Sequence, residues 1–312
     1  MTKMALGTLL STAPMIVGCS SLTDDGSGGT PGIGGSAGSN GVALTCEETA
    51  SSCMNGQIDP IVRDEGCMVP DPPVLPDACD GTESLERPLS CAPTGNTLTY
   101  RLTYAEIVDD CNLGYDLDDC NGNSCSLGEA APGEGMGGVD NAIAALAQLA
   151  IDVGTNLSVV NQVFYDNFCN GETNVLFVVD VNSQENCMIV ETFISGEPEG
   201  TVLLNLSDAG CISGKLANIP FPFRDTILSL DNAVVRMTVS ESGLANGIVG
   251  GTIDRTTATS LAARWIGVID STFVSRLLDI NKDLDGDPLV ACNALSVALR
   301  VGGVAEPEAA TP

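Results

Sequence analysis

Residues 234–239 read Val-Val-Arg-Met-Thr-Val, and this stretch decides the fold class. Val235, Met237 and Val239 alternate with polar side chains, so the two kinds point to opposite faces of an extended chain. Such alternation is typical of a β-strand that buries one face in a core and exposes the other. We therefore expect a protein organised around a sheet.

Strand-like segments of the same kind lie on both sides of this stretch, separated by turn residues. Short strands at short intervals favour antiparallel pairing between neighbours in the chain. The predicted strands are 175–181, 187–194, 201–206, 212–216, 226–230, 234–239 and 248–253. We expect an antiparallel meander sheet of six or seven strands. Residues 98–108 fit either a further strand or the start of a short helix.

Four segments carry apolar residues at helical spacing. They begin at Asp140, near Val159, at Thr257 or Thr259, and at Leu289. Two glycines, at positions 302 and 303, are expected to end the last of these helices. The predicted fold class is α+β, a disulfide-stapled meander sheet packed with helices and preceded by an irregular region rich in cysteine and proline.

The first nineteen residues have the composition of a secretion signal. Lys3 precedes an uncharged, mostly apolar run over residues 4–17, which is too short to span a membrane. The run closes with Ile16-Val17-Gly18-Cys19, which resembles a bacterial lipobox. The resemblance implies that Cys19 is acylated and becomes the mature N-terminus. We therefore expect an outer-membrane lipoprotein of the cell envelope, held to the membrane by its N-terminal lipid.

The amino-acid composition of the chain after the signal peptide indicates several further segments. Gly and Ser dominate residues 19–41, which we interpret as a tether behind the lipid. An irregular segment rich in Cys and Pro follows at 42–95, and the α+β main domain is expected at 96–303. Residues 304–312 are predicted to form a disordered tail, and residues 1–18 are the signal peptide.

The cysteines of residues 42–95 indicate disulfide bonds. If Cys19 carries lipid, twelve of the 13 cysteines remain, which allows up to six bridges in an exported protein. The sequence alone does not fix their pairing. The segment contains five cysteines, so at least one bridge is expected to leave it. The segment is either a small stapled module or a collar laced onto the main domain.

The charge and the missing residue types exclude several functions. The net charge is −29, from 41 acidic and 12 basic residues, so nucleic acid is not expected as a partner and cations are. The chain has no histidine, which excludes Ser-His-Asp and Cys-His catalysis and removes the commonest zinc ligands. An enzyme of this composition would have to use carboxylates.

The acidic loop 279–287 reads Asp-Ile-Asn-Lys-Asp-Leu-Asp-Gly-Asp and resembles the calcium loops of EF-hands and thrombospondin type 3 repeats. The resemblance implies calcium as a cofactor. Its ligands would be Asp279, Asn281, Asp283, Asp285 and Asp287.

Two features of the sequence leave other interpretations of the acidic loops open. Cys292 occupies the position of the bidentate glutamate, so an Asp-Gly turn with helix-capping aspartates explains loop 279–287 equally well. A second acidic loop, with Asp116, Asp118 and Asp119, precedes an Asn-Ala-apolar stretch, as the first loop does. Either a diverged internal duplication or chance explains this repetition of short segments.

These observations lead to one principal hypothesis and two alternatives. We expect a non-catalytic surface lipoprotein that binds or scaffolds an unknown envelope partner, with calcium making its loops rigid. The first alternative is a carboxylate-dependent hydrolase of the glycosidase type, which would require paired carboxylates in a cleft. The second is an adhesion or shell protein that uses its negative charge for hydration and cation bridging.

Overall fold

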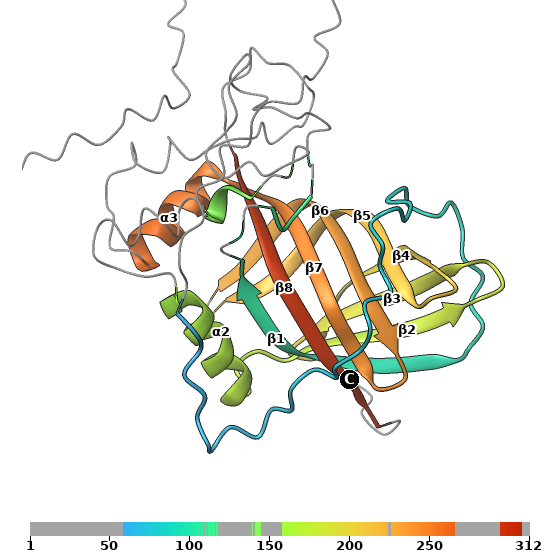
Figure 1. The fold of residues 1–312 in the computed structure, drawn as a ribbon, viewed down its shortest axis with the longest axis horizontal. Coiled ribbons are helices and arrows are strands. Elements are labelled where there is room, and N and C mark those ends of the chain that lie inside the picture. Colours follow the sequence, from blue (N-terminus) through green and yellow to red (C-terminus); the bar gives the residue numbers. More distant parts are fainter. Residues whose placement is uncertain are drawn as a thin grey trace, which may run out of the picture.

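The protein is a closed barrel of eight antiparallel strands (Figure 1). The computed structural model describes residues 59–108, 110, 112–115, 117, 139, 141–144, 158–223, 226–265 and 294–307. The strands are β1 (Thr97–Ile107), β2 (Val175–Asn182), β3 (Cys187–Ile194), β4 (Glu197–Leu206), β5 (Cys211–Phe223), β6 (Thr226–Ser240), β7 (Gly243–Asp254) and β8 (Ala294–Glu306). The helices with given bounds are α2 (Ser158–Cys169) and α3 (Arg255–Trp265).

Each strand pairs with its neighbours in the chain, and β8 pairs with β1 to close the barrel. The closing register runs from Thr99 opposite Glu306 to Ile107 opposite Leu299. It shifts between Leu102 and Tyr104, where β1 is irregular. Closure leaves no free edge at this junction, the usual liability of a sheet.

The predicted α+β fold class is wrong. All seven segments predicted as strands lie in β2–β7, with 226–230 and 234–239 joined in one long strand. The error lies in the two strands that close the barrel. The sequence of residues 98–108 fits either a strand or a helix, and residues 289–300 were predicted as a helix. Residues 294–306 instead form β8, so the sheet closes on itself rather than packing against a helical layer. Glycines 302 and 303 lie inside this strand and end no helix.

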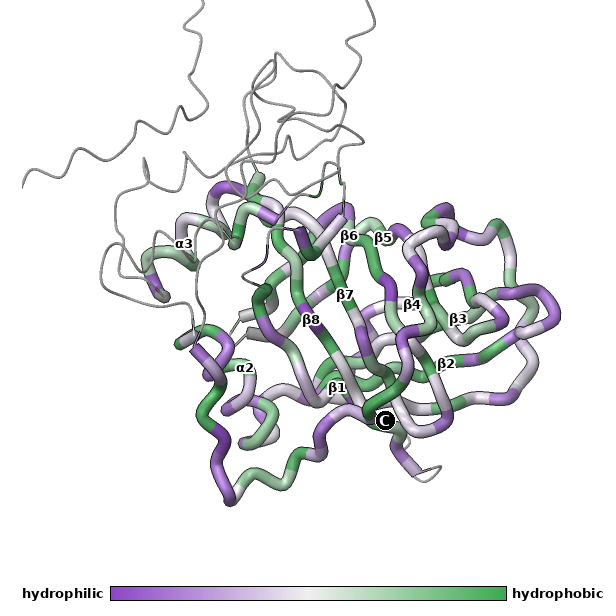
Figure 2. The backbone as a smooth tube through the Cα atoms, viewed as in Figure 1, coloured by the Kyte–Doolittle hydropathy of each residue, from purple (hydrophilic) through white to green (hydrophobic). Residues whose placement is uncertain are grey.

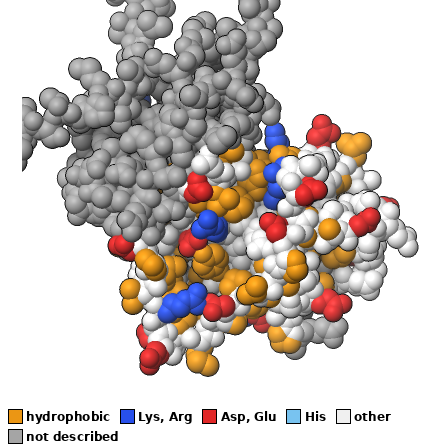
Figure 3. All heavy atoms as spheres, in the orientation of Figure 1, with side chains coloured by type: hydrophobic (Ala, Val, Ile, Leu, Met, Phe, Trp, Pro, Cys, Tyr) orange, Lys and Arg blue, Asp and Glu red, His pale blue; other side chains and the backbone are white. Residues whose placement is uncertain are grey.

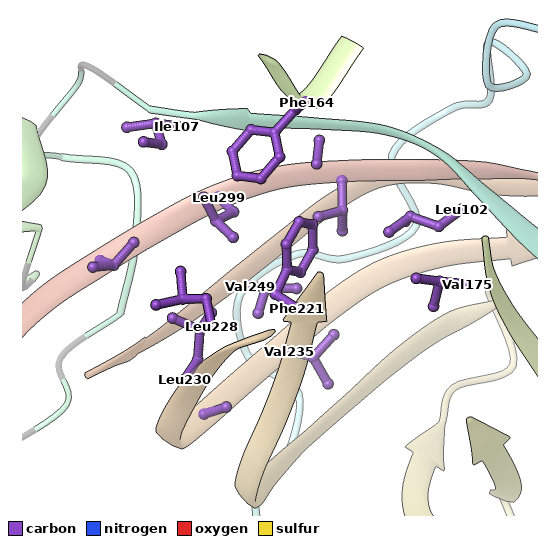
Figure 4. Packing of buried hydrophobic residues seen from close by; sticks show 14 of the residues in the cluster. Leu102, Ile107, Phe164, Val175, Phe221, Leu228, Leu230, Val235, Val249 and Leu299 are labelled. Carbon is purple, nitrogen blue, oxygen red and sulfur yellow. The ribbon is translucent and has the colours of Figure 1, made fainter. Parts of the chain in front are cut away.

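Side chains alternate between the interior and the outside of the barrel, and Figure 2 shows hydrophobic and hydrophilic residues interspersed along the strands. In β8, Leu295, Val297 and Leu299 belong to the buried cluster that fills the interior, whereas Arg300 is exposed. Burial of such aliphatic side chains contributes about 1.5–3 kcal/mol each to folding. The core therefore lies inside the barrel, with inward residues from every strand (Figure 4).

Two buried asparagines complete the backbone hydrogen bonds where β1 ends. Asn161 of α2 accepts a hydrogen bond from the Ile107 amide at 2.7 Å and donates one to the Ile107 carbonyl at 3.3 Å. Asn141 accepts from the Ala298 amide at 3.1 Å and donates to the Val108 carbonyl at 3.4 Å. The side-chain amide of each asparagine thus supplies the donor and the acceptor that a neighbouring strand would otherwise provide. Buried backbone groups need such hydrogen-bond partners.

The helix α3 follows β7 directly. Asp254 caps it by accepting hydrogen bonds from the amides of Thr256 and Thr257, so the threonines predicted as caps lie in its first turns. Ala258, Leu261 and Ala262 join the core cluster. In the described part of the chain, no helix combines the length and apolar character needed to cross a membrane.

Residues 59–96, here called the collar, hold no helix or strand and wrap the outside of the barrel. Three disulfides tie them to it: Cys67–Cys169 at the end of α2, Cys79–Cys211 at the start of β5, and Cys91–Cys187 at the start of β3. All three bridges leave the segment, so of the two predicted arrangements the described residues adopt the collar. Every cysteine in the described ranges is paired.

The path of the collar follows the strands in turn (blue to cyan in Figure 1). It begins beside α2, where Gln162 exchanges two hydrogen bonds with the Val62 backbone. It then crosses β8 at Gly302, where an added Cβ would lie 2.7 Å from Pro72, so only glycine permits this approach. Near its end, the amides of Thr94 and Gly95 donate to Asp180 of β2. The collar thereby contacts both halves of the barrel wall.

Candidate ligand-binding cavity

The interior of the barrel contains an apolar cavity to which all eight strands contribute side chains. Its volume is about 90 Å³, and the hollow measures about 850 Å³ when the part open to solvent is included. The lining is aliphatic apart from two phenylalanines, two methionines and the half-buried Thr192. Met188 and Met237 add flexible side chains that can adapt to the shape of a ligand.

An aromatic pair closes one end of this cavity. Phe221 of β5 lines the cavity and meets Phe164 of α2 edge to face, with ring centroids 5.4 Å apart and planes at 83° (Figure 4). Phe164 is 2% exposed, so α2 inserts it into the core rather than leaving it on the surface. Edge-to-face geometry is the favourable arrangement for two such rings.

Tyr100 lies near the hairpin that joins β6 to β7, at the other end of the barrel. Its hydroxyl donates a hydrogen bond to the Ser240 carbonyl at 2.9 Å. Burial raises the pKa of Tyr100 to about 12, and the nearby charge of Glu241 adds to this effect. The phenol is therefore neutral at any physiological pH and serves as a fixed donor.

The wall of the barrel is incomplete between β4 and β5. These strands share two residue pairs, Asn205 with Ser213 and Leu206 with Ile212, whereas every other adjacent pair of strands shares at least five. Beyond the two pairs, residues 197–204 pair only with β3 and residues 214–223 only with β6, within the described chain. We call this unpaired stretch the seam.

Residues Ser84–Glu86 of the collar fill the end of the seam where the strands begin to separate. The Lys215 amide donates to the Leu85 carbonyl at 2.9 Å, so the collar takes the place of β4 at this point. Asn205 donates to the carbonyls of Ser84 and Glu86, and the Ser213 hydroxyl also donates to Ser84. The collar thus fixes the closed end of the seam and leaves the remainder unpaired.

The cavity is suited to binding by burial rather than to proton transfer. None of its lining side chains ionises, and the hydroxyl of Thr192 is its only side-chain hydrogen-bond donor. An apolar group placed there gains about 0.8 kcal/mol for each methylene removed from water. An isolated polar group would lose its hydrogen bonds to water without replacement.

Every residue predicted as a site from the sequence lies outside the described residues. This applies to the lipidation site Cys19, to the calcium loop 279–287 with Asp279, Asn281, Asp283, Asp285 and Asp287, and to the second acidic loop with Asp116, Asp118 and Asp119. These assignments stay predictions. The sequence interpretation did not anticipate the cavity, because a single strand pattern shows which face is buried but not whether the buried faces enclose a space.

Two clusters combine cysteines with a carboxylate: Cys79 and Cys211 with Glu83, and Cys91 and Cys187 with Glu185. In both clusters the two cysteines are joined in a disulfide. Metal ligation requires the thiolate, so the oxidised clusters act as structural links. Glu185 accepts a hydrogen bond from the Ala92 amide and so helps to hold the collar.

Comparison of the chain with protein-family models, with curated proteins and with solved structures gave no match. The function therefore has to be argued from the cavity and the wall around it.

Proposed function

We propose that this protein is a non-catalytic binding protein that holds one small apolar molecule inside its barrel. The observation that carries the proposal is the cavity, which is lined by apolar side chains from all eight strands. Eight-stranded barrels have interiors just wide enough either to be filled by side chains or to hold one small ligand. Here the side chains leave a hollow with an open mouth, which favours the second use.

The expected affinity follows from the area that a ligand would bury. A molecule that buries ten methylene-sized groups gains about 8 kcal/mol from burial. The free-energy cost of losing translational and rotational freedom offsets a large part of this gain. Dissociation constants in the micromolar range or weaker are therefore expected for simple apolar ligands.

A neutral apolar fluorophore, N-phenyl-1-naphthylamine, tests the proposal. We expect saturable binding with a stoichiometry near one and a blue-shifted emission. Val190→Phe fills part of the cavity and should weaken binding at least tenfold. Glu191→Phe adds the same ring at the neighbouring, exposed position and should leave binding unchanged. Absence of saturable binding to the parent protein would show that the hollow is only a packing defect.

The carboxylate-dependent hydrolase gains no support from this site. A glycosidase needs two carboxyl groups on either side of its substrate, and the lining of the cavity carries none.

We place the protein at the cell envelope, held to the outer membrane by a lipid on Cys19. The support is the lipobox resemblance of Ile16-Val17-Gly18-Cys19 and the Gly/Ser-rich tether behind it. Cys19→Ser should abolish incorporation of labelled palmitate. Continued labelling of this variant would contradict the assignment.

We also propose that calcium binds the acidic loop 279–287 and stabilises the protein. Four aspartates stand within nine residues there, with Lys282 as the only basic residue to offset them. Millimolar calcium should raise the melting temperature, and Asp283→Ala combined with Asp285→Ala should remove most of the increase. Identical melting curves with calcium and with chelator, at matched ionic strength, would favour the capped-turn interpretation.

A further inference from the structure

The seam between β4 and β5 borders the cavity from the side. Val202 and Leu204 of β4 line the cavity from one side of the seam, and Leu216 and Ile219 of β5 line it from the other. Leu204 is buried, whereas Val202, Leu216 and Ile219 are half-buried. Three of these four apolar side chains are therefore partly accessible beyond the two residue pairs that join the strands.

Prolines on both strands oppose closure of the seam by strand pairing. Pro198 lies in β4 and Pro220 in β5, and neither has the amide hydrogen that a ladder between the two strands would use. Proline is confined to edges and bulges of sheets for this reason. The same residues disfavour a peptide that would pair with these edges as an added strand.

A lateral opening suits a ligand that has an apolar chain and a polar end. The interior offers a single hydroxyl, so a polar head could not be buried there without losing hydrogen bonds. Through the seam, a chain can lie in the cavity while its head stays in water. The cavity volume of about 90 Å³ is small, so one alkyl chain suits it better than two.

The charge around the seam restricts the head. Glu197 and Glu199 are exposed on β4, whereas Lys215 is the basic residue of β5. Figure 3 shows carboxylates scattered over the face it presents, in keeping with the net charge of −29. An anionic head would meet repulsion here, and an uncharged or cationic head would not.

We propose that the ligand is a single-chain amphiphile whose alkyl chain enters the barrel sideways through the seam and whose uncharged or cationic head remains outside. This inference rests on the proposed binding function and adds the ligand class and the route.

Binding kinetics of decanol test the route. Val202→Trp places a bulky ring at the seam, while Val181→Trp places the same ring on an inward, half-buried position of β2 next to the β2–β3 hairpin. In stopped-flow displacement of the fluorophore, Val202→Trp should slow association about tenfold and should also slow dissociation, so that exchange is retarded even where the added ring weakens binding. Val181→Trp should leave both rates unchanged. Slowing by Val181→Trp alone would place the route at the end of the barrel and overturn the inference.

Competition between ligands of equal chain length tests the class. Decanol and decyltrimethylammonium should displace the fluorophore, and decanoate should be at least fivefold weaker at low salt, with the difference shrinking at high salt. Affinity should rise about fourfold for each added methylene, which corresponds to about 0.8 kcal/mol, until the cavity is full. Equal binding of decanoate, or displacement only by extended peptides, would overturn the class. Failure of the fluorophore itself to bind would instead refute the proposed function.

Discussion

Phe164 of α2 meets Phe221 of β5 across the interior of the barrel, with their ring centroids 5.4 Å apart. The helix lies against β1, and β5 is four strands away from β1 in a closed order of eight, which makes it the opposite wall. The pair therefore connects a helix outside the sheet to the far side of the cavity. Because Phe221 lines the cavity and lies on β5, one of the two strands of the seam, the position of α2 affects the shape of the ligand site.

Removal of the Phe164 ring should destabilise the protein and enlarge the cavity. Phe164→Ala is expected to lower the free energy of unfolding by about 3–5 kcal/mol, measured by urea denaturation. In a double-mutant cycle with Phe221→Ala, the coupling should be about 0.5–1.5 kcal/mol. Val159→Ala on the exposed side of the same helix is the control and should change stability by less than 1 kcal/mol. Additive effects of the two phenylalanines would contradict a direct contact.

The disulfide Cys79–Cys211 should hold the closed end of the seam. Its removal, by Cys79→Ala with Cys211→Ala, should cost about 2–5 kcal/mol of stability. It should also speed hydrogen exchange of the Lys215 amide, because the Leu85 carbonyl that accepts from this amide lies six residues beyond Cys79.

Removal of Cys67–Cys169, which ties the collar to α2 instead, serves as the matched control. It should also reduce stability but leave exchange at Lys215 nearly unchanged under native conditions. Equal acceleration by both pairs of substitutions would mean that the collar loosens as a whole rather than at the seam.

The sequence was sufficient for a strand such as β6, whose two faces differ in polarity, and insufficient for β8, whose first residues are buried on both faces. Val235, Met237 and Val239 alternate with polar residues, and the strand prediction there is confirmed. In β8, by contrast, residues 294–299 are all buried, and the Ala142 amide donates a hydrogen bond to the Ser296 hydroxyl. Their sequence, Ala-Leu-Ser-Val-Ala-Leu, satisfies the helical and the strand spacing equally, so only pairing with β1 and β7 decides the outcome.

The candidate site depends on contacts between residues far apart in the chain, which no local sequence pattern reveals. Pro198 and Pro220 lie outside the strands predicted from the sequence, and their role follows from β4 and β5 being neighbours that separate after two residue pairs. Asn161 was an ordinary polar residue of an amphipathic helix until the fold placed it beside the end of β1. Barrel closure and these contacts join residues far apart in the sequence.

Asn161 supplies the hydrogen bonds that end β1, and its loss should be severe. Asn161→Ala leaves the amide and carbonyl of Ile107 buried without these partners, at about 1–3 kcal/mol each. Gln162→Ala is the matched control, because this amide also makes two hydrogen bonds to a backbone, that of Val62, but at an exposed position where water replaces it. Thermal unfolding should show a large decrease for the first variant and a small one for the second. Equal decreases would mean that burial of the Ile107 groups is unimportant.

Asp180 should make the attachment of the collar depend on pH. Hydrogen bonds from the Thr94 hydroxyl and from the amides of Thr94 and Gly95 lower the pKa of this carboxyl below its ordinary value. The folded protein therefore binds the proton less readily than the unfolded chain, whose aspartate pKa is about 3.9. The resulting stabilisation is fully present above that pH and is lost as the pH falls through the lower folded pKa.

Asp180→Ala should accordingly reduce the free energy of unfolding by about 1.5–3 kcal/mol at pH 7, the range for hydrogen bonds to a charged group. The difference from the parent protein should narrow as the pH falls below about 4. Asp208→Ala removes the same charge at an exposed turn position and should have little effect at either pH. Urea denaturation of the three proteins between pH 2 and 7 measures this. A difference between Asp180→Ala and the parent that stays constant over the whole range would show that Asp180 acts by packing and not through its charge.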